Sequence, residues 1–285
     1  MSQTTDSIQR FLFNEGQVRG EIVRLEESLR ESLAKGDYSD GAALLLAESL
    51  TATTLLAGIL KVPGRISLQA RGEGPVSLLM TDCSQDRGIR GLIHSTDAPT
   101  QGSVPELLGR GQLAITMEPE GGQRYQGIVP LESETLSQCL QDYFTRSEQL
   151  DTLILLFANR QRAGGLMLQK MPGYEETDDQ DLWDRLTHLA ATTQREELLE
   201  LAPEEVLHRL FHEEEISLYP AEAVTFHCHC NRERTEQALL TMGADECYSI
   251  LAEQGEISVD CQFCNQNYRF EQDDLETLFG PPRHH

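Results

Sequence analysis

Four cysteines near the C-terminus form two close pairs, Cys228 with Cys230 and Cys261 with Cys264. The pairs are separated by 30 residues, so the intervening segment can fold back and bring four thiolates to one tetrahedral zinc ion. The first pair encloses only His229, which is shorter than the spacing of about two to four residues usual in structural zinc modules. Such a pair is also well placed to oxidise. The sequence therefore predicts a zinc site whose sulfurs can take part in redox chemistry.

Two histidines and three arginines lie near these cysteines. His227 and His229 could each replace a sulfur, but four thiolates already complete a tetrahedron, so we predict that both are solvated spacers. The arginines either offset the negative charge of a zinc tetrathiolate or solubilise the surface, and the sequence leaves both roles open. These three residues are Arg232, Arg234 and Arg269.

The other cysteines bear on the cellular compartment. Residues 1–10 lack an apolar signal core, and the most lipophilic stretch, residues 42–60, is interrupted by Glu48. We therefore expect neither secretion nor membrane insertion, and we predict a cytoplasmic protein. In that reducing compartment the C-terminal cysteines should bind metal at rest rather than form disulfides. The remaining three, which lack paired spacing, should be small buried hydrophobes: Cys83, Cys139 and Cys247.

The charge of the chain is strongly acidic. Its 285 residues include 23 Lys and Arg against 47 Asp and Glu, giving a net charge of −24. Nucleic-acid binding depends on basic residues that neutralise phosphates, so nucleic acid is not an expected partner. Residues 174–223 carry 15 acidic residues against three arginines, a net of −12, so half of the excess lies in this one segment.

Residues 1–173 read as a mixed α+β domain. A sheet is predicted from short apolar runs bounded by Gly and Pro, at residues 66–69, 76–81, 111–117 and 125–131. Helical periodicity occupies residues 21–33, 42–60 and 132–147. The stretch 42–60 is apolar nearly all round, which predicts a helix buried between layers.

Two smaller regions follow. Residues 174–223 contain helical apolar faces at Leu182, Leu186 and Leu189 and again after Pro203, which suits the first position of a helix. These are either ordinary surface helices or, given their mutual repulsion, helices that fold only while docked. Residues 224–285 have few large hydrophobes, and a domain this small usually needs a metal or disulfides.

The cysteine region resembles the heat-shock protein 33 family of redox-regulated holdase chaperones. The resemblance rests on residues 226–234 and 255–264, followed by Tyr268 and Phe270. It continues upstream through Gly74-Pro75, Arg90-Gly91, residues 125–129, Tyr143-Phe144, residues 147–149 and residues 163–165, so it spans nearly the whole chain.

The resemblance implies a role for each part. Cys228, Cys230, Cys261 and Cys264 would bind one Zn²⁺ in the reduced, inactive state, and oxidation would release it through Cys228–Cys230 and Cys261–Cys264 disulfides. Residues 1–173 would be the chaperone core, 174–223 a metastable linker and 224–285 the redox switch. The partners implied are unfolding client proteins, and the resemblance allows a homodimer when oxidised. Asn231 and Cys247 depart modestly from the family pattern.

Two other functions compete with an ATP-independent holdase, which is not an enzyme. No G-x-x-x-x-G-K-[ST] phosphate-binding sequence occurs, in keeping with ATP independence. A thiol-disulfide oxidoreductase would use Cys261 and Cys264 at a helix start, whereas strand-like residues 257–259 and 268–270 predict a zinc knuckle in a hairpin. A zinc-ribbon adaptor for a fixed protein partner would keep its metal through mild oxidation.

Overall fold

The computed structural model describes residues 6–60, 62–96, 101–173, 179 and 181–280. The chain divides into two compact units, Met1–His227 and Cys228–His285. Two six-stranded sheets with helices form the first unit, and a two-stranded sheet with three helices forms the described part of the second. The mixed α+β class predicted from the sequence is confirmed.

One sheet of the first unit is antiparallel and runs in the order β10-β1-β2-β9-β8, with β11 also paired to β1. Its strands are β1 (Ser7–Phe13), β2 (Val18–Leu25), β8 (Thr152–Ala158), β9 (Ala163–Lys170), β10 (Ile216–Leu218) and β11 (Glu222–Ala223).

The second sheet runs in the order β12-β5-β4-β3-β6-β7, and β12 alone pairs in parallel. The four strands predicted from the sequence all belong to this sheet, as β3, β4, β6 and β7. The sequence patterns did not predict the first sheet or strands β5 and β12. The strands are β3 (Gly64–Gly72), β4 (Val76–Cys83), β5 (Gly88–Ser95), β6 (Gly111–Pro119), β7 (Tyr125–Pro130) and β12 (Thr225–Phe226).

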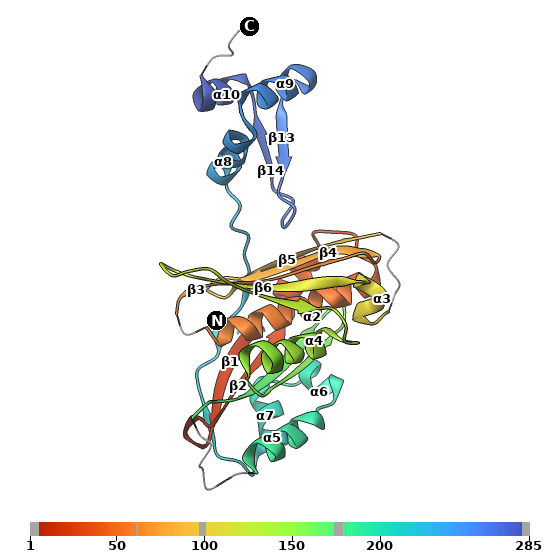
Figure 1. The fold of residues 1–285 in the computed structure, drawn as a ribbon, viewed down its shortest axis with the longest axis vertical. Helices are drawn as coiled ribbons and strands as arrows, with labels where there is room; N and C mark the ends of the chain where they lie inside the picture. Colours follow the sequence, from red (N-terminus) through yellow and green to blue (C-terminus); the bar gives the residue numbers. More distant parts are fainter. Residues whose placement is uncertain (1–5, 61, 97–100, 174–178, 180, 281–285) are drawn as a thin grey trace. The chain divides into compact units, whose positions relative to one another are not determined.

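Helix α2 (Asp40–Gly58) lies between the two sheets (Figure 1). It packs against β3, β4 and β5 on one side and against β2, β8 and β9 on the other, which explains why it is apolar all round. The buried central helix is thus confirmed. By length and composition alone, α2 is the one described helix that could cross a membrane. However, 89% of its apolar 18-residue window is buried inside the protein.

Three helices from the acidic segment cover the outer face of the β1-β2-β9-β8 sheet (Figure 1). They are α5 (Leu182–Ala191), α6 (Arg195–Glu200) and α7 (Pro203–Phe211). Pro203 occupies the first turn of α7, as predicted. Alternate strand residues face these helices, whereas their neighbours face α2. The strand residues on the linker side are Phe11, Phe13, Val18, Ile22, Leu166 and Leu168.

The helix predicted over residues 21–33 is wrong in its first half. Strand β2 runs to Leu25, and α1 (Glu27–Leu33) begins two residues later. Both faces of β2 are covered, so its apolar residues do not alternate and resemble a helical pattern. The side chain of Asp6 accepts from the backbone N–H groups of Glu26, Glu27 and Ser28 and so fixes where α1 begins.

The helix predicted over residues 132–147 begins later than expected. Thr135 caps α4 (Leu136–Tyr143) through a capping box with Gln138, and a π-helical turn, Phe144–Glu148, continues it. Two further short elements complete the described part of this unit, the 3₁₀ turn Asn14–Gly16 and α3 (Val104–Leu108).

The second unit has a small apolar core. Its elements are α8 (Arg232–Met242), α9 (Ala244–Gln254), β13 (Ile257–Asp260), β14 (Asn267–Phe270) and α10 (Gln272–Phe279). The strands form the antiparallel hairpin that the sequence predicts. Among the described residues of this unit, five apolar side chains are buried: Leu239, Cys247, Ile257, Phe270 and Leu275.

Because α2 is packed on all sides, truncation within it should be costly. We expect Leu50→Ala, at a fully buried position, to lower the free energy of unfolding of the first unit by about 2–5 kcal/mol. Leu218→Ala, at a leucine that is 44% exposed on β10, is the control and should cost less than about 1 kcal/mol. Urea denaturation followed by circular dichroism measures both. Equal losses would contradict the placement of α2 at the centre of the core.

Candidate metal centre

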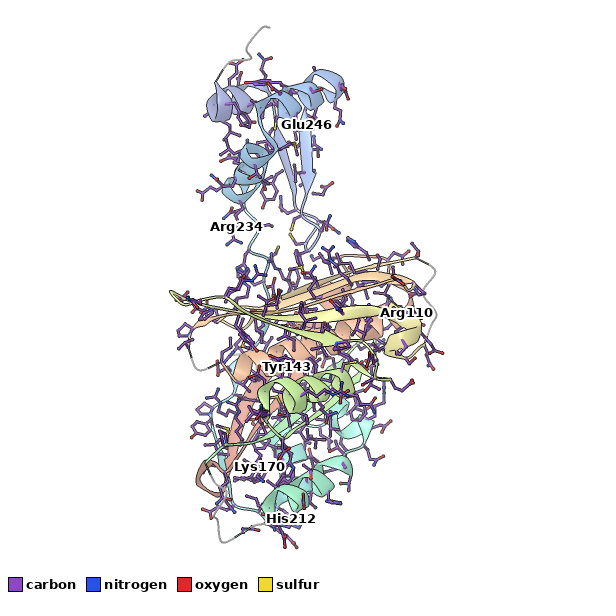
Figure 2. The ribbon with its side chains drawn as sticks, in the orientation of Figure 1. Arg110, Tyr143, Lys170, His212, Arg234 and Glu246 are labelled. Atoms are coloured by element: carbon purple, nitrogen blue, oxygen red, sulfur yellow. The ribbon has the colours of Figure 1, made fainter. Side chains whose placement is uncertain are left out.

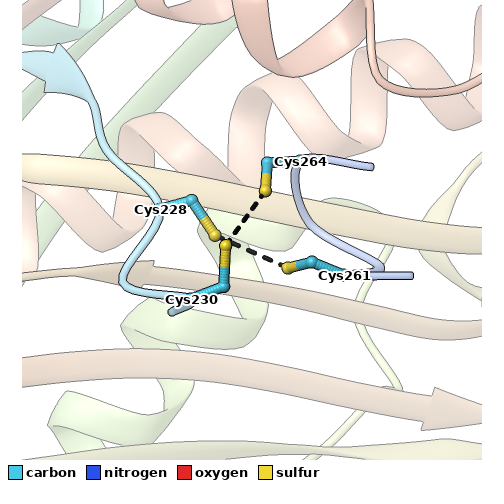
Figure 3. A group of neighbouring side chains, drawn as sticks. All are labelled: Cys228, Cys230, Cys261 and Cys264. Atoms are coloured by element: carbon cyan, nitrogen blue, oxygen red, sulfur yellow. Dashed lines mark hydrogen bonds between the residues drawn. The ribbon is translucent and has the colours of Figure 1, made fainter. Parts of the chain in front are cut away.

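The four predicted cysteine sulfurs converge in the second unit (Figure 3). All four Sγ atoms lie within 4.8 Å of one another, with 3.6 Å between Cys228 and Cys261 and 3.3 Å between Cys230 and Cys264. A zinc tetrathiolate with bonds of about 2.3 Å has sulfur–sulfur edges of about 3.8 Å. The four residues therefore fit a tetrahedral zinc ion, and within the described chain no other group of His, Cys, Asp or Glu has metal-binding proximity.

Two short backbone segments present these sulfurs. Cys228 and Cys230 lie just before α8, whose N-cap Asn231 accepts from the backbone N–H of Arg234 at 2.8 Å. Arg234 in turn donates to the carbonyl of His229 at 2.9 Å; its side chain is labelled in Figure 2. These bonds fix the turn between the first cysteine pair and the helix.

The second pair lies in the turn that joins β13 to β14. The N–H of Asn265 donates to the carbonyl of Cys261 at 2.8 Å, and the N–H of Cys261 donates to the carbonyl of Gln266 at 2.9 Å. Asn265 has a φ of 61°, a left-handed conformation that Asn tolerates better than most residues. This is the predicted knuckle in a hairpin. Cys261 does not lie at a helix start, as a thioredoxin-like site would require.

Burial controls the protonation of the second pair. Desolvation raises the pKa of Cys261 and Cys264, while backbone N–H groups of Phe263, Cys264 and Gln266 oppose the rise by donating to these sulfurs. Without a metal the two thiols would therefore stay largely protonated near neutral pH. A divalent cation would reverse that preference, because coordination deprotonates a thiol outright.

Tyr268 is a contact of the site that sequence reasoning did not assign. Its hydroxyl donates to the sulfur of Cys230 at 3.3 Å, and this bond raises the pKa of Tyr268 to about 12. Tyr268 lies on β14, opposite Val259 on β13. No spacing rule links it to Cys230, 38 residues earlier, so only the folded hairpin reveals the contact.

The arginines near the site take different roles. Arg232 lies over the ring of Phe270, 4.4 Å from its centroid, and pairs with Asp274 and Glu236. Arg269 approaches Glu256 at 3.7 Å. Arg232 therefore joins α8 to the core of this unit, a role that neither alternative from the sequence included.

The histidines and the other cysteines are not members of the group of four sulfurs. His227 is exposed and His229 is half-buried, and neither belongs to the group of four sulfurs. The prediction that the remaining cysteines are buried is confirmed, and burial raises the pKa of each: Cys83, Cys139 and Cys247.

Comparison with known proteins identifies the family of this chain. Residues 6–271 match the Hsp33 protein family. The 33 kDa chaperonin of Pseudomonas fluorescens is 45% identical over 97% of this chain and 94% of its own length, and that of Hahella chejuensis is 44% identical over 98% and 99%. This chain belongs to the Hsp33 family.

The fold comparison agrees. The crystal structure of a 33 kDa chaperonin, a heat shock protein 33 homolog from Thermotoga maritima, superposes with a TM-score of 0.83, covering 96% of this chain and 97% of that one. Its sequence is only 24% identical, so the Hsp33 fold persists across large sequence change.

Tyr268 offers a direct test of the metal centre. We expect Tyr268→Phe to keep one zinc per chain but to weaken zinc affinity about tenfold or more, because a donor to a ligand sulfur is lost. Tyr248→Phe is the matched control, since its hydroxyl donates to the carbonyl of Gly280 instead. Competition with a chromogenic chelator measures both. Equal affinities in the two variants would show that the Tyr268 bond does not support the metal.

The ligand set itself is tested by four single Cys→Ser variants, at Cys228, Cys230, Cys261 and Cys264. Each should lose tight zinc binding, whereas Cys247→Ser, buried in the same unit, should retain it. Metal analysis after dialysis gives the stoichiometry. Retention of zinc with wild-type affinity by any of the four would remove that residue from the ligand set.

Proposed function

We propose that this chain is a redox-regulated, ATP-independent holdase chaperone of the cytoplasm, not an enzyme, and that its clients are unfolding proteins. The observation that carries the proposal is the convergence of four sulfurs in a chain of the Hsp33 family. The relatives are named chaperonins, which supports the chaperone class. Residues 1–173 would act as the core, 174–223 as the linker and 224–285 as the switch.

The resting state would hold one zinc through the four cysteines. When bound, zinc would keep the sulfurs as thiolates, the form that reacts with peroxide, and would join two segments separated by 30 residues. Structural zinc contributes about 10–16 kcal/mol of apparent binding free energy in small modules. The second unit, with five buried apolar side chains in its described part, would depend strongly on such a contribution.

Oxidation would replace this link with local bonds. Each pair of thiolates would give up two electrons to one peroxide, which would take two protons from the solvent, forming a disulfide and two waters. Disulfides Cys228–Cys230 and Cys261–Cys264 would close loops of only a few residues, which constrain an unfolded chain weakly. The second unit would then lose the long-range connection that stabilises it.

Linker release would supply the client surface. The three helices α5, α6 and α7 cover six large apolar strand side chains, including Phe11 and Phe13. Phe211 of α7 packs against Phe13 with ring centroids 5.0 Å apart. If the helices left, a contiguous apolar face would become exposed, and such faces bind other proteins. The linker charge of −12 favours departure, because like charges repel.

Close approach of α6 to the sheet depends on Gly164. A Cβ at this position would overlap the carbonyl oxygen of Leu198, so only glycine allows the helix to dock at this distance. Arg24 and Arg195 hold the same helix region by donating to the carbonyls of Leu201 and Ala158. Docking thus relies on a few local contacts as well as on the apolar face.

Two alternatives remain as outcomes of experiment. A zinc-ribbon adaptor would keep its zinc under mild peroxide and would not suppress aggregation. A thiol-disulfide oxidoreductase would turn over a disulfide substrate through Cys261 and Cys264. A homodimer of the oxidised form stays a prediction.

The disulfide pairing is the first test of the mechanism. In the structure the Cys228 and Cys261 sulfurs lie 3.6 Å apart and those of Cys230 and Cys264 3.3 Å apart, so proximity alone would also allow bonds between the two segments. We nevertheless expect Cys228–Cys230 and Cys261–Cys264, because neighbours in sequence stay close once the metal has left. Peptide mapping by mass spectrometry after peroxide treatment distinguishes the pairings. Dominant bonds between the segments would preserve the clamp and contradict the switch.

Linker docking can be weakened without touching the cysteines. We expect Leu210→Glu, at a buried position on α7, to suppress aggregation of an unfolded test protein with zinc still bound. His208→Glu introduces the same side chain on the exposed side of α7 and should stay inactive. Gly164→Ala should resemble Leu210→Glu through steric overlap instead of charge. Light scattering and metal analysis give the two readouts. Inactive Leu210→Glu and Gly164→Ala proteins would show that linker release is insufficient for activity.

A further inference from the structure

A second site lies in the first unit, away from the cysteines. A cavity of about 290 Å³ opens between the N-terminal half of α2, the start of α3 and the start of α4. Its walls are largely apolar, and its size suits a small ligand, since pockets for drug-sized molecules begin at about 300 Å³. The apolar wall is formed by Leu44, Leu45, Val104, Leu107 and Leu136.

One ionisable group of α2 reaches this cavity. Glu48 lines it and is the acidic residue that interrupts the apolar sequence of the central helix. Glu48 is half-buried, and among the described residues its carboxylate has neither a hydrogen bond nor an ion pair. Its neighbours on α2 at Ser49, Thr53 and Thr54 do have partners for their side chains. In this part of α2, the carboxylate of Glu48 is thus the polar group that is available to bind a ligand.

The charged groups around Glu48 are few. Glu134 lines the cavity and is exposed, so it adds negative charge. Arg195 of α6 lowers the pKa of Glu48 through its charge, but it donates its hydrogen bond to the carbonyl of Ala158. On α3, Glu106 accepts from Ser103 in a capping box. The cavity therefore has apolar walls and a surplus of negative charge.

We propose that this cavity binds a primary alkylammonium group, with the cation on Glu48 and the alkyl body against the leucines of α2, α3 and α4. A cation satisfies the carboxylate, and the chain supplies no such partner there. The alkyl body removes the apolar wall of the cavity from water, which is favourable. Either a free amine or the side chain of a lysine in a polypeptide carries this group.

The protonation of Glu48 gives the site a pH signature. Burial raises its pKa to about 7, against the smaller opposing effect of Arg195. An ammonium ligand needs the ionised carboxylate. Its affinity therefore approaches its maximum well above pH 7 and declines as the pH falls through 7. Between pH 8 and pH 6 the ionised fraction falls about tenfold, and affinity should fall by the same factor.

The test uses reduced, zinc-bound protein and n-butylamine, followed by NMR chemical-shift titration. We expect saturable binding at pH 8 that perturbs the methyl groups of Leu45, Leu107 and Leu136, and about tenfold weaker binding at pH 6. n-Butanol, the neutral counterpart, should bind more weakly at pH 8 and with no pH dependence. Equal binding of the alcohol and the amine at pH 8, or no saturable shift near the cavity, would overturn the proposal.

Variants identify the carboxylate. Glu48→Gln should weaken n-butylamine binding at pH 8 at least tenfold and abolish its pH dependence, whereas Glu132→Gln, at an exposed position that does not line the cavity, should match the wild type. Unchanged binding in Glu48→Gln would overturn the assignment. Nα-acetyl-lysine methylamide distinguishes the sources: binding of both probes assigns a polypeptide lysine, and binding of n-butylamine alone assigns a free amine. A failed linker or redox test would leave this result intact.

Discussion

The β1-β2-β9-β8 sheet has two apolar faces, and this constraint organises the first unit. Alternate side chains of every strand point to opposite faces, so a sheet that is apolar on both sides needs a layer on each. Helix α2 supplies one layer and is itself shared with the second sheet. The acidic linker helices supply the other layer, although like charges within them oppose compact packing. The helices α5, α6 and α7 thus cover an apolar face of the sheet, while the repulsion among their own charges opposes this docking.

The second unit has the opposite problem, because it has little apolar surface to bury. Four sulfurs, backbone amides of the β13–β14 turn and the hydroxyl of Tyr268 meet at one end of this unit. Metal ligation at these sulfurs would compensate for the small core. Cys228 follows the last strand of the first unit by only two residues, so a change in the metal centre is covalently close to the end of the linker. The proposed switch uses this short connection between a metal-dependent unit and a marginally docked segment.

The convergence of the four cysteines and the central helix could be predicted because each rests on a local sequence pattern, close cysteine pairs in one case and a long apolar stretch in the other. Strand β2 was misread as helix because burial on both faces removes alternation. Asp6, which caps α1, and Tyr268, which contacts Cys230, act across long sequence separations that no local rule detects. The sequence predicts repulsion among the linker charges, yet Glu214 pairs with Arg185 of α5 at 2.6 Å and so joins two parts of the linker to each other. The cavity at Glu48 is formed where three helices pack together, so the sequence alone does not reveal it.

Amide hydrogen exchange across α5, α6 and α7 tests the central claim, that loss of the metal centre releases the linker from the sheet. The wild-type protein is measured by mass spectrometry while zinc-bound and again after peroxide treatment, with aggregation of an unfolded test protein followed in parallel. We expect protected linker amides and no chaperone activity before oxidation. After oxidation we expect loss of that protection together with activity, while α2 stays protected. Linker amides that remain protected in fully active protein would show that linker release is not the switch.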